Sequence, residues 1–245
     1  MMARKTNTHI FWPQGVCQQD LLTKKIQFAW DIHETLARKN KTECAAITLR
    51  YSSTLLKNAR ALRIGLKTIT KKEEYIAAEA YAHYFEQHDY THLARYITEV
   101  ANAYVPIKGI SKLLEELAQK GHEHRIASNI GKAYLPILVN RFSTKSKTPL
   151  FSYMNGGTII DYGLPLPDAP IFPIKSAVHC AVECKPKDNL FQIHTMMYNQ
   201  DNSSVIVFID DKIKNIQAAA RNGWVGIKFS SVKKLRADLI GLGLL

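Results

Sequence analysis

Residues 203–229 read SSVIVFIDDKIKNIQAAARNGWVGIKF, and this stretch decides the fold class. Residues 205–209 are all apolar and mostly β-branched, which is typical of a parallel strand buried on both faces. Asp210 and Asp211 end this run, apolar side chains then recur at helical spacing, and Gly223 stands where a helix commonly ends. Residues 224–229 form a second strand pattern. Strand, helix and strand in this order predict an α/β fold with a mainly parallel sheet.

Three further segments place polar residues at predicted strand ends. Residues 26–36, IQFAWDIHETL, are apolar up to Asp31, and residues 109–129 combine a helical pattern with a strand that stops at Ser128. A third segment places Lys185 ahead of another helical pattern. In a parallel sheet the C-terminal strand ends open onto one edge, where ligands usually bind. We therefore expect one site at that edge, made of Asp31, Ser128, Lys185, Asp210 and Asp211.

The stretches between these motifs differ in character. Residues 39–106 show apolar stripes at helical spacing and no strand pattern, which predicts a helical insert. Residues 143–183 are rich in proline and glycine, and NGG at 155–157 followed by TIIDYG predicts a turn with a short strand or hairpin. The predicted domains are therefore a core of residues 1–38 and 107–245 and a helical unit of residues 39–106.

The overall composition narrows the class of protein. Hydrophobic residues make up 46% of the 245 residues, as in globular proteins, and no apolar run is long enough to span a membrane. The first residues lack the apolar stretch of a secretory leader, and four cysteines are too few for a disulfide framework. Both features predict a cytoplasmic protein, although an export signal outside the N-terminus would leave no such pattern.

The net charge is strongly positive. The chain has 33 Lys and Arg against 21 Asp and Glu, a net charge of +12. Such a surface attracts polyanions such as nucleic acid, anionic lipid or phosphorylated small molecules. The basic residues are scattered in pairs, and no nucleic-acid-binding motif with interleaved aromatic residues occurs. This pattern argues against direct binding of nucleic acid and favours a generally basic surface.

Phosphoryl transfer is the chemistry that the four strand ends favour. A carboxylate such as Asp31 can attack phosphorus to give an acyl-phosphate, provided that cations screen the two anions. Asp31 together with Asp211 can hold Mg²⁺, which prefers oxygen ligands. Lys185 can neutralise one phosphate oxygen, and the Ser128 hydroxyl can donate to another. Taken alone, Asp31 is better explained as a cap of the segment that follows it.

In the same order along the chain, these motifs resemble those of the haloacid dehalogenase (HAD) superfamily. DIHET at 31–35 is similar to the first family motif, D-x-D-x-T, and RIASN at 125–129 to the second. CKPKDNLF at 184–191 resembles the third, and VIVFIDDKIKN at 205–215 the fourth. The resemblance covers nearly the whole chain. It implies a Rossmann-like three-layer core with a helical cap, here residues 39–106, inserted after the first motif.

The resemblance also implies an activity and roles for single residues. The implied activity is that of a Mg²⁺-dependent hydrolase, most simply a phosphatase that forms an aspartyl-phosphate on Asp31 from a phosphorylated small-molecule substrate. The implied metal ligands are Asp31, the backbone carbonyl of His33, Asp211, and Asp210 or Asn215. The implied phosphate contacts are Thr35, Ser128, Asn129 and Lys185, with Thr35 also supporting the turn.

His33 and Glu34 depart from the family pattern. Phosphatases of the family carry a second Asp, their general acid and base, where this chain has His33, and glycine is usual at position 34. One hypothesis is that His33 substitutes, since the ordinary imidazole pKa near 6.5 suits acid–base catalysis, although a neighbouring Mg²⁺ would weaken it as an acid.

Two other hypotheses stay open. The chain catalyses a different hydrolysis, like the dehalogenases and phosphonatases of the superfamily, which also replace that Asp. Alternatively, it is a weakly catalytic relative that binds a phosphorylated ligand or a protein partner. The retained nucleophile Asp31 favours chemistry, and the extra carboxylate of Glu34 counts against it. We favour the phosphatase hypothesis, with the binding hypothesis next.

Overall fold

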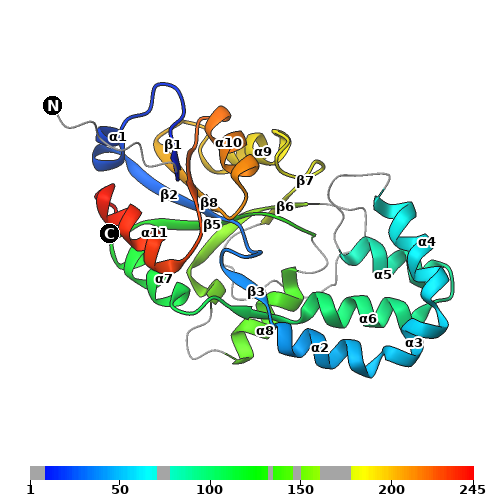
Figure 1. Ribbon diagram of the computed structural model, residues 1–245. Helices are drawn as coiled ribbons and strands as arrows, with labels where there is room; N and C mark the ends of the chain where they lie inside the picture. The colour runs from blue at the N-terminus through cyan, green and yellow to red at the C-terminus, as the bar shows by residue number, and fades with distance from the viewer. Residues whose placement is uncertain (1–8, 71–77, 132–134, 146–149, 161–177) are drawn as a thin grey trace.

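The computed structural model describes residues 9–70, 78–131, 135–145, 150–160 and 178–245. Within these ranges seven strands form one sheet in the order β1-β9-β8-β2-β5-β6-β7 (Figure 1). The edge strand β1 runs antiparallel to β9, and the other neighbours are parallel. The strands are β1 (Ile10–Phe11), β2 (Lys25–Trp30), β5 (Glu123–Gly131), β6 (Met154–Ile160), β7 (Val178–Ala181), β8 (Ser204–Asp210) and β9 (Val225–Lys228). This mainly parallel sheet confirms the predicted α/β class.

Helices cover both faces of the sheet. One face packs against α7 (Ile110–Gln119), α8 (Leu135–Lys145) and α11 (Val232–Gly241), and it also receives Leu21 from the short helix α1 (Gln18–Thr23). The opposite face packs against α9 (Asn189–Tyr198) and α10 (Ile213–Arg221). A 3₁₀ turn, η1 (Leu150–Tyr153), precedes β6. The result is the predicted Rossmann-like core of three layers (Figure 1).

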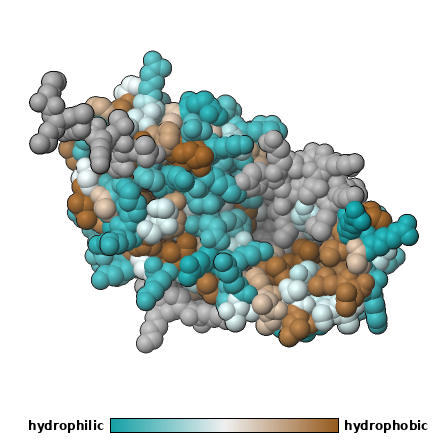
Figure 2. Space-filling view, in the orientation of Figure 1, coloured by the Kyte–Doolittle hydropathy of each residue, from teal (hydrophilic) through white to brown (hydrophobic). Residues whose placement is uncertain are grey.

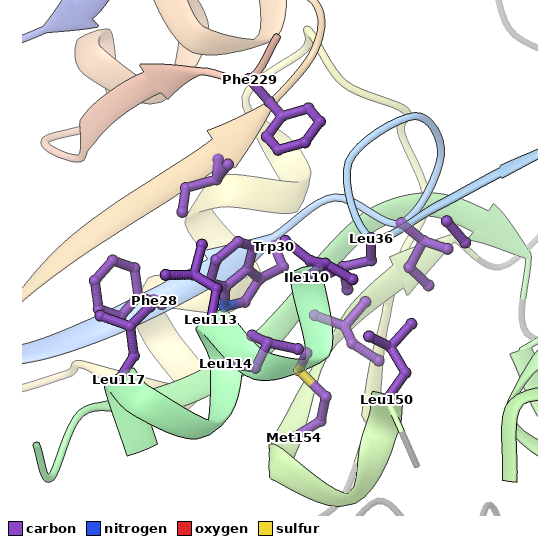
Figure 3. Packing of buried hydrophobic residues seen from close by; sticks show 14 of the residues in the cluster. Phe28, Trp30, Leu36, Ile110, Leu113, Leu114, Leu117, Leu150, Met154 and Phe229 are labelled. Carbon is purple, nitrogen blue, oxygen red and sulfur yellow. The ribbon is translucent and has the colours of Figure 1, made fainter. Parts of the chain in front are cut away.

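Side chains of the central strand β2 pack alternately against the helices on the two faces of the sheet. Phe28 and Trp30 belong to the cluster on the α7 side, and Ala29, between them, belongs to the cluster on the α9 and α10 side. The Trp30 Nε1–H donates to Nδ1 of the buried His124 at 3.0 Å, which satisfies the one polar group of the indole. Figure 3 shows Phe28 and Trp30 over the inner face of α7, with Leu113, Leu114 and Leu117.

A helical lobe, defined here as α2 to α6, lies beside these layers (Figure 1). It has small hydrophobic clusters of its own, around Phe85 and Leu93 and around Ile47 and Tyr51. An antiparallel ribbon of two short strands connects it to the core. The elements are β3 (Ala37–Lys39), α2 (Lys41–Arg50), α3 (Ser52–Lys57), α4 (Ala59–Thr70), α5 (Ala78–Gln87), α6 (Thr91–Asn102) and β4 (Tyr104–Pro106).

This connecting ribbon differs from the prediction that residues 39–106 are helical throughout. Its strands are three residues each, too short for an alternating pattern to appear in the sequence. The first helix begins where Asn40 caps it, its side chain accepting from the backbone N–H of Glu43. The helical prediction is therefore wrong at the two ends of the segment, where the chain leaves and re-enters the core.

A short strand is present as predicted, and residues 161–163 of TIIDYG lie outside the described residues, but the NGG motif at 155–157 does not form the predicted turn. It lies inside β6, which pairs in parallel with β5 and β7. The register against β5 shifts between His124 and Ile126, and Gly156 (φ 85°) and Gly157 (φ 156°) adopt backbone conformations that favour glycine. A Cβ on Gly157 would lie 2.4 Å from the Ile126 carbonyl oxygen. The glycines therefore mark an irregular strand that passes close to its neighbour, which sequence alone does not separate from a turn.

The surface differs between the two parts of the molecule. Figure 2 shows hydrophobic side chains gathered over the helical lobe, and Leu49, Leu56 and Ile64 of this lobe are exposed. Among the described residues, no helix has the length and apolar character needed to cross a membrane.

Candidate active site

Asp31 lies at the C-terminal end of β2, where its backbone N–H still donates to the Ile209 carbonyl at 3.0 Å and so continues the pairing with β8. Its side chain is buried. Oδ1 accepts from the Ser128 hydroxyl at 2.8 Å and from Lys185 Nζ at 2.9 Å. Three segments that are far apart in the sequence therefore meet at one carboxylate oxygen.

Lys185 is fully buried, and its ammonium donates three hydrogen bonds. The acceptors are Asp31 Oδ1 at 2.9 Å, Asp210 Oδ2 at 2.8 Å and the Ala127 carbonyl at 2.7 Å. A buried charge is tolerated when it is paired and all its donors are used, as they are here. The same ammonium lies 4.7 Å from the ring centre of Phe208. Lys185 thus links the ends of β2, β5 and β8.

Lys185 reaches this position from a loop that follows β7, at the far edge of the sheet. Asn129 of β5 holds the loop, because its Oδ1 accepts from the Lys185 N–H at 2.7 Å and its Nδ2 donates to the Lys185 carbonyl at 3.0 Å. The Asn129 side chain is therefore engaged with the Lys185 backbone. Its predicted contact with phosphate stays a prediction.

Asp210 and Asp211 follow one another at the end of β8 but have different surroundings. Asp210 is fully buried, and besides Lys185 it accepts from Asn215 Nδ2 at 2.8 Å and from the Lys212 N–H at 2.7 Å. Asp211 is half-buried, and its Oδ1 has no hydrogen-bond partner within the described part of the chain. Asn215 therefore orients Asp210, whereas Asp211 offers an unused oxygen to the site.

The charges of the site shift the pKa values of its groups. Burial alone would raise the pKa of Asp31, but Lys185, His33 and the hydrogen bond from Ser128 together lower it. Burial would lower the pKa of Lys185, but Asp210 and Asp31 raise it. Burial, with the added repulsion of Asp210 and Asp31, raises the pKa of Asp211 from 3.8 to about 6. Asp211 therefore holds its negative charge less readily than Asp31 does.

A divalent cation fits this arrangement. Asp31, Asp210 and Asp211 each place one carboxylate oxygen within 4.8 Å of the other two. Lys185 pairs with two of the three carboxylates, Asp31 and Asp210, so when all three are ionised they exceed this ammonium by two negative charges. The buried, unpartnered Oδ1 of Asp211 is the kind of oxygen that a hard cation takes as ligand.

The loop after Asp31 turns sharply before it enters β3. Leu36 and Ala37 both donate from their backbone N–H to the Ile32 carbonyl, at 3.1 and 2.9 Å. Glu34 has φ 57°, in the left-handed region that glycine favours. Thr35 is buried, and its Oγ1 has no hydrogen-bond partner in the described part of the chain. The predicted phosphate contact of Thr35 stays a prediction.

His33 lies in the same loop and packs against Tyr104 of β4, with 4.9 Å between the ring centres. Its Nδ1 is buried and has no hydrogen-bond partner in the described residues. Burial lowers the pKa of His33, and the charges of Lys212, Lys185 and Lys39 lower it further, against the opposing effect of Asp31. His33 is therefore a neutral imidazole near pH 7.

Comparisons with solved structures agree with this fold. A predicted HAD-like family hydrolase from Porphyromonas gingivalis aligns over 89% of this chain and 98% of its own, with a TM-score of 0.52 and 14% sequence identity. A HAD family enzyme from Bacteroides thetaiotaomicron aligns over 85% and 95%, with a TM-score of 0.51 and 14% identity. No family model matches the sequence, and no curated protein matches it. The chain has the HAD fold.

The HAD fold brings together five of the residues that the motifs singled out. Asp31, Ser128, Lys185 and Asp210 are joined by direct hydrogen bonds, and Asp211 lies next to them. Ser128 does not end its strand, because β5 continues to Gly131, but the pairing of β5 with β2 stops at Ile126. Tyr104 was not predicted, because it approaches His33 only through the β3–β4 ribbon, about seventy residues further along the chain.

Proposed function

We propose that this chain is a Mg²⁺-dependent phosphatase that acts through an aspartyl-phosphate on Asp31. One observation carries the proposal. A single buried ammonium, Lys185 Nζ, bonds both Asp31 and Asp210, and the Ser128 hydroxyl bonds the same Asp31 oxygen. The pKa of Asp31 is lowered while that of the neighbouring Asp211 is raised. Opposite shifts in adjacent acids are typical of functional sites. In this proposal the helical lobe acts as the cap over a phosphorylated small-molecule substrate.

Mg²⁺ would be held by Asp31, Asp211 and the His33 carbonyl, with Asp210 and Asn215 assisting. When bound, the ion supplies positive charge that screens the phosphate from the carboxylates. The unpartnered Asp211 Oδ1 and the excess of carboxylates over ammonium support this assignment.

In the first step a carboxylate oxygen of Asp31 attacks the phosphorus, and the bond from phosphorus to the leaving oxygen breaks. The Ser128 hydroxyl and the Lys185 ammonium, which both contact Asp31 in the free protein, would turn to the phosphoryl oxygens. The Ile32 N–H, 3.4 Å from the Ser128 hydroxyl oxygen, is a further donor at this point. The leaving alkoxide needs a proton, and the imidazolium form of His33 would supply it.

In the second step water attacks the phosphorus of the aspartyl-phosphate, and Asp31 leaves as a carboxylate. The neutral imidazole of His33 takes the proton of the attacking water. The lowered pKa of His33 favours this second role over the first, because the neutral form is the base and only a small imidazolium fraction exists near pH 7. Substrates whose leaving oxygen needs no proton should therefore react best.

This asymmetry gives the test of the proposed function. With Mg²⁺ present, we expect the wild type to hydrolyse an aryl phosphate, whose phenolate leaves unprotonated, at least about tenfold faster than an alkyl phosphate. His33→Asp restores the acid of the family motif and should raise the rate with the alkyl phosphate more than with the aryl phosphate. Asp31→Asn should abolish both rates. Steady-state assays of the three proteins measure this.

Loss of turnover in Asp31→Asn, with folding shown to be intact by circular dichroism, would support Asp31 as the nucleophile. Equal rates for wild type and Asp31→Asn would contradict the proposal. The same assay with a haloacid and a phosphonate would detect the alternative hydrolytic reactions.

Binding without turnover is the second candidate function, and the lowered pKa of His33 is the observation that favours it. A chain that retains Asp31, Ser128 and Lys185 but lacks a competent acid would hold a phosphorylated ligand, or a protein partner, without releasing product. Binding without turnover predicts that the wild type is inert with both substrates while His33→Asp is active. The phosphatase proposal predicts measurable turnover by the wild type.

A further inference from the structure

A cavity of about 380 Å³ lies beside the candidate active site, at the same edge of the sheet. None of the residues proposed to hold phosphate or metal lines it. Its wall is nevertheless joined to the site at two points. Glu34 directly follows His33 in the loop after β2, and the Phe229 N–H donates to the Asp210 carbonyl at 2.8 Å. The cavity is therefore a neighbour of the catalytic groups with a lining of its own.

The lining of this cavity is dominated by positive charge. Arg38 comes from β3, Lys108 from the segment after β4, and Lys233 from the first turn of α11. None of the three forms an ion pair with another residue in the described ranges. Glu34 is the one carboxylate among the lining residues. Three like charges around one hollow repel each other, and a bound anion removes that repulsion.

Hydrogen-bond donors complete the lining. Ser230 and Ser231 contribute hydroxyl groups, and Ser231 is the N-cap of α11, whose Oγ accepts from the Lys234 N–H at 3.2 Å. Its hydroxyl hydrogen is thereby left to donate to a ligand. Arg38 adds a guanidinium, whose planar fork suits two oxygens of one phosphate. The volume lies in the range of small-molecule sites.

We propose that this cavity binds a small polyanion of the diphosphate class, at a site separate from the phosphoryl group at Asp31. The three cations come from three different segments, and a ligand with two anionic groups can contact them better than a ligand with one. Arg38 and Lys108 lie on the two segments that connect the helical lobe to the core, and Lys233 lies on the core helix α11. The bound polyanion ties both connections to the core. The site does not depend on any reaction at Asp31.

Calorimetric titration with pyrophosphate, in EDTA and without divalent metal, tests the proposal. The double variant Lys108→Gln/Lys233→Gln should bind pyrophosphate about tenfold more weakly than the wild type, or worse. The matched control, Lys57→Gln/Lys120→Gln, changes two exposed lysines outside the cavity and removes the same charge. It should bind within about twofold of the wild type. Equal weakening in both double variants would mean attraction to net charge alone and would overturn the proposal.

Two single variants separate this site from the candidate active site. Glu34→Gln removes the carboxylate from the lining and should tighten pyrophosphate binding severalfold. Ser128→Ala removes a hydroxyl next to Asp31 and should leave the binding unchanged. Binding that Ser128→Ala abolishes, or a wild type that binds no pyrophosphate, would overturn the proposal. These titrations do not measure turnover, so their results can be interpreted even if the protein is not a phosphatase.

Discussion

Lys185 is the residue on which the candidate site depends most. Its ammonium is completely buried and is shared by Asp31 and Asp210, so removing it would leave two buried carboxylates without their counter-charge. That loss affects folding as well as chemistry, and Lys185 is therefore a poor choice for a first substitution. Asp211 is better suited, because it is half-buried and its Oδ1 takes part in no hydrogen bond within the described chain.

Asp211 should make the stability of the metal-free protein depend on pH. Its pKa is raised from 3.8 to about 6, so the folded state holds this proton more tightly than the unfolded state does. The stabilisation is present below pH 4 and is lost as the pH rises to about 6. Asp211→Asn cannot ionise. Its melting temperature relative to that of the wild type should therefore increase between pH 4 and pH 7. The increase should be about 2–4 °C for each kcal/mol of stability that the wild type loses.

Thermal unfolding at several pH values in EDTA measures this difference. Adding Mg²⁺ at pH 7 should raise the melting temperature of the wild type and have little effect on Asp211→Asn. A constant difference between the two proteins from pH 4 to pH 7 would show that Asp211 is not under electrostatic strain.

The packing of β9 against α10 depends on a glycine. A Cβ added to Gly226 would lie 2.7 Å from Ile216 Cγ2 and 2.9 Å from the Ile216 carbonyl oxygen, so the helix would have to move away from the strand. We expect Gly226→Ala to lower the free energy of unfolding by about 1–3 kcal/mol. Gly241→Ala is the matched control, because nothing lies within 4 Å of its added Cβ and it is part of α11.

Gly241→Ala should leave stability unchanged or raise it by up to about 1 kcal/mol. Urea unfolding of the two variants gives the comparison. Similar effects of both substitutions would contradict the close contact between β9 and α10.

The elements that the sequence predicts best are those with long, regular patterns. Residues 203–229 form β8, α10 and β9 as expected, because apolar runs and helical spacing report directly on which faces are buried. Short or irregular elements were missed, because they lack a period. These are the edge strand β1 and the β3–β4 ribbon. The short strand predicted at NGG and TIIDYG is present as β6, but NGG lies inside it and not in a turn.

In the whole molecule, the residues of the site are easier to predict from the sequence than the loops and contacts that bring them together. Asp31 follows β2, Asp210 ends β8, and Ser128 lies within β5 beyond the point where β5 pairs with β2, so the order of these adjacent strands brings the three together. Lys185 belongs to a loop beyond the edge strand β7, and the Asn129 side chain bonds its backbone. The sequence singled out Asn129 as a phosphate contact and did not predict this bond to the Lys185 loop. The contact of Tyr104 with His33 depends on how the helical lobe re-enters the core.

The central claim is that Asp31 carries the phosphoryl group during turnover. The most direct measurement is rapid quenching of the enzyme with an aryl phosphate and Mg²⁺, borohydride reduction, and mass spectrometry of the peptide that contains residue 31. Borohydride converts an aspartyl-phosphate to homoserine. Homoserine at position 31 that appears only with substrate and is absent from Asp31→Asn is the predicted result. Substrate consumption with residue 31 unmodified throughout would contradict the account.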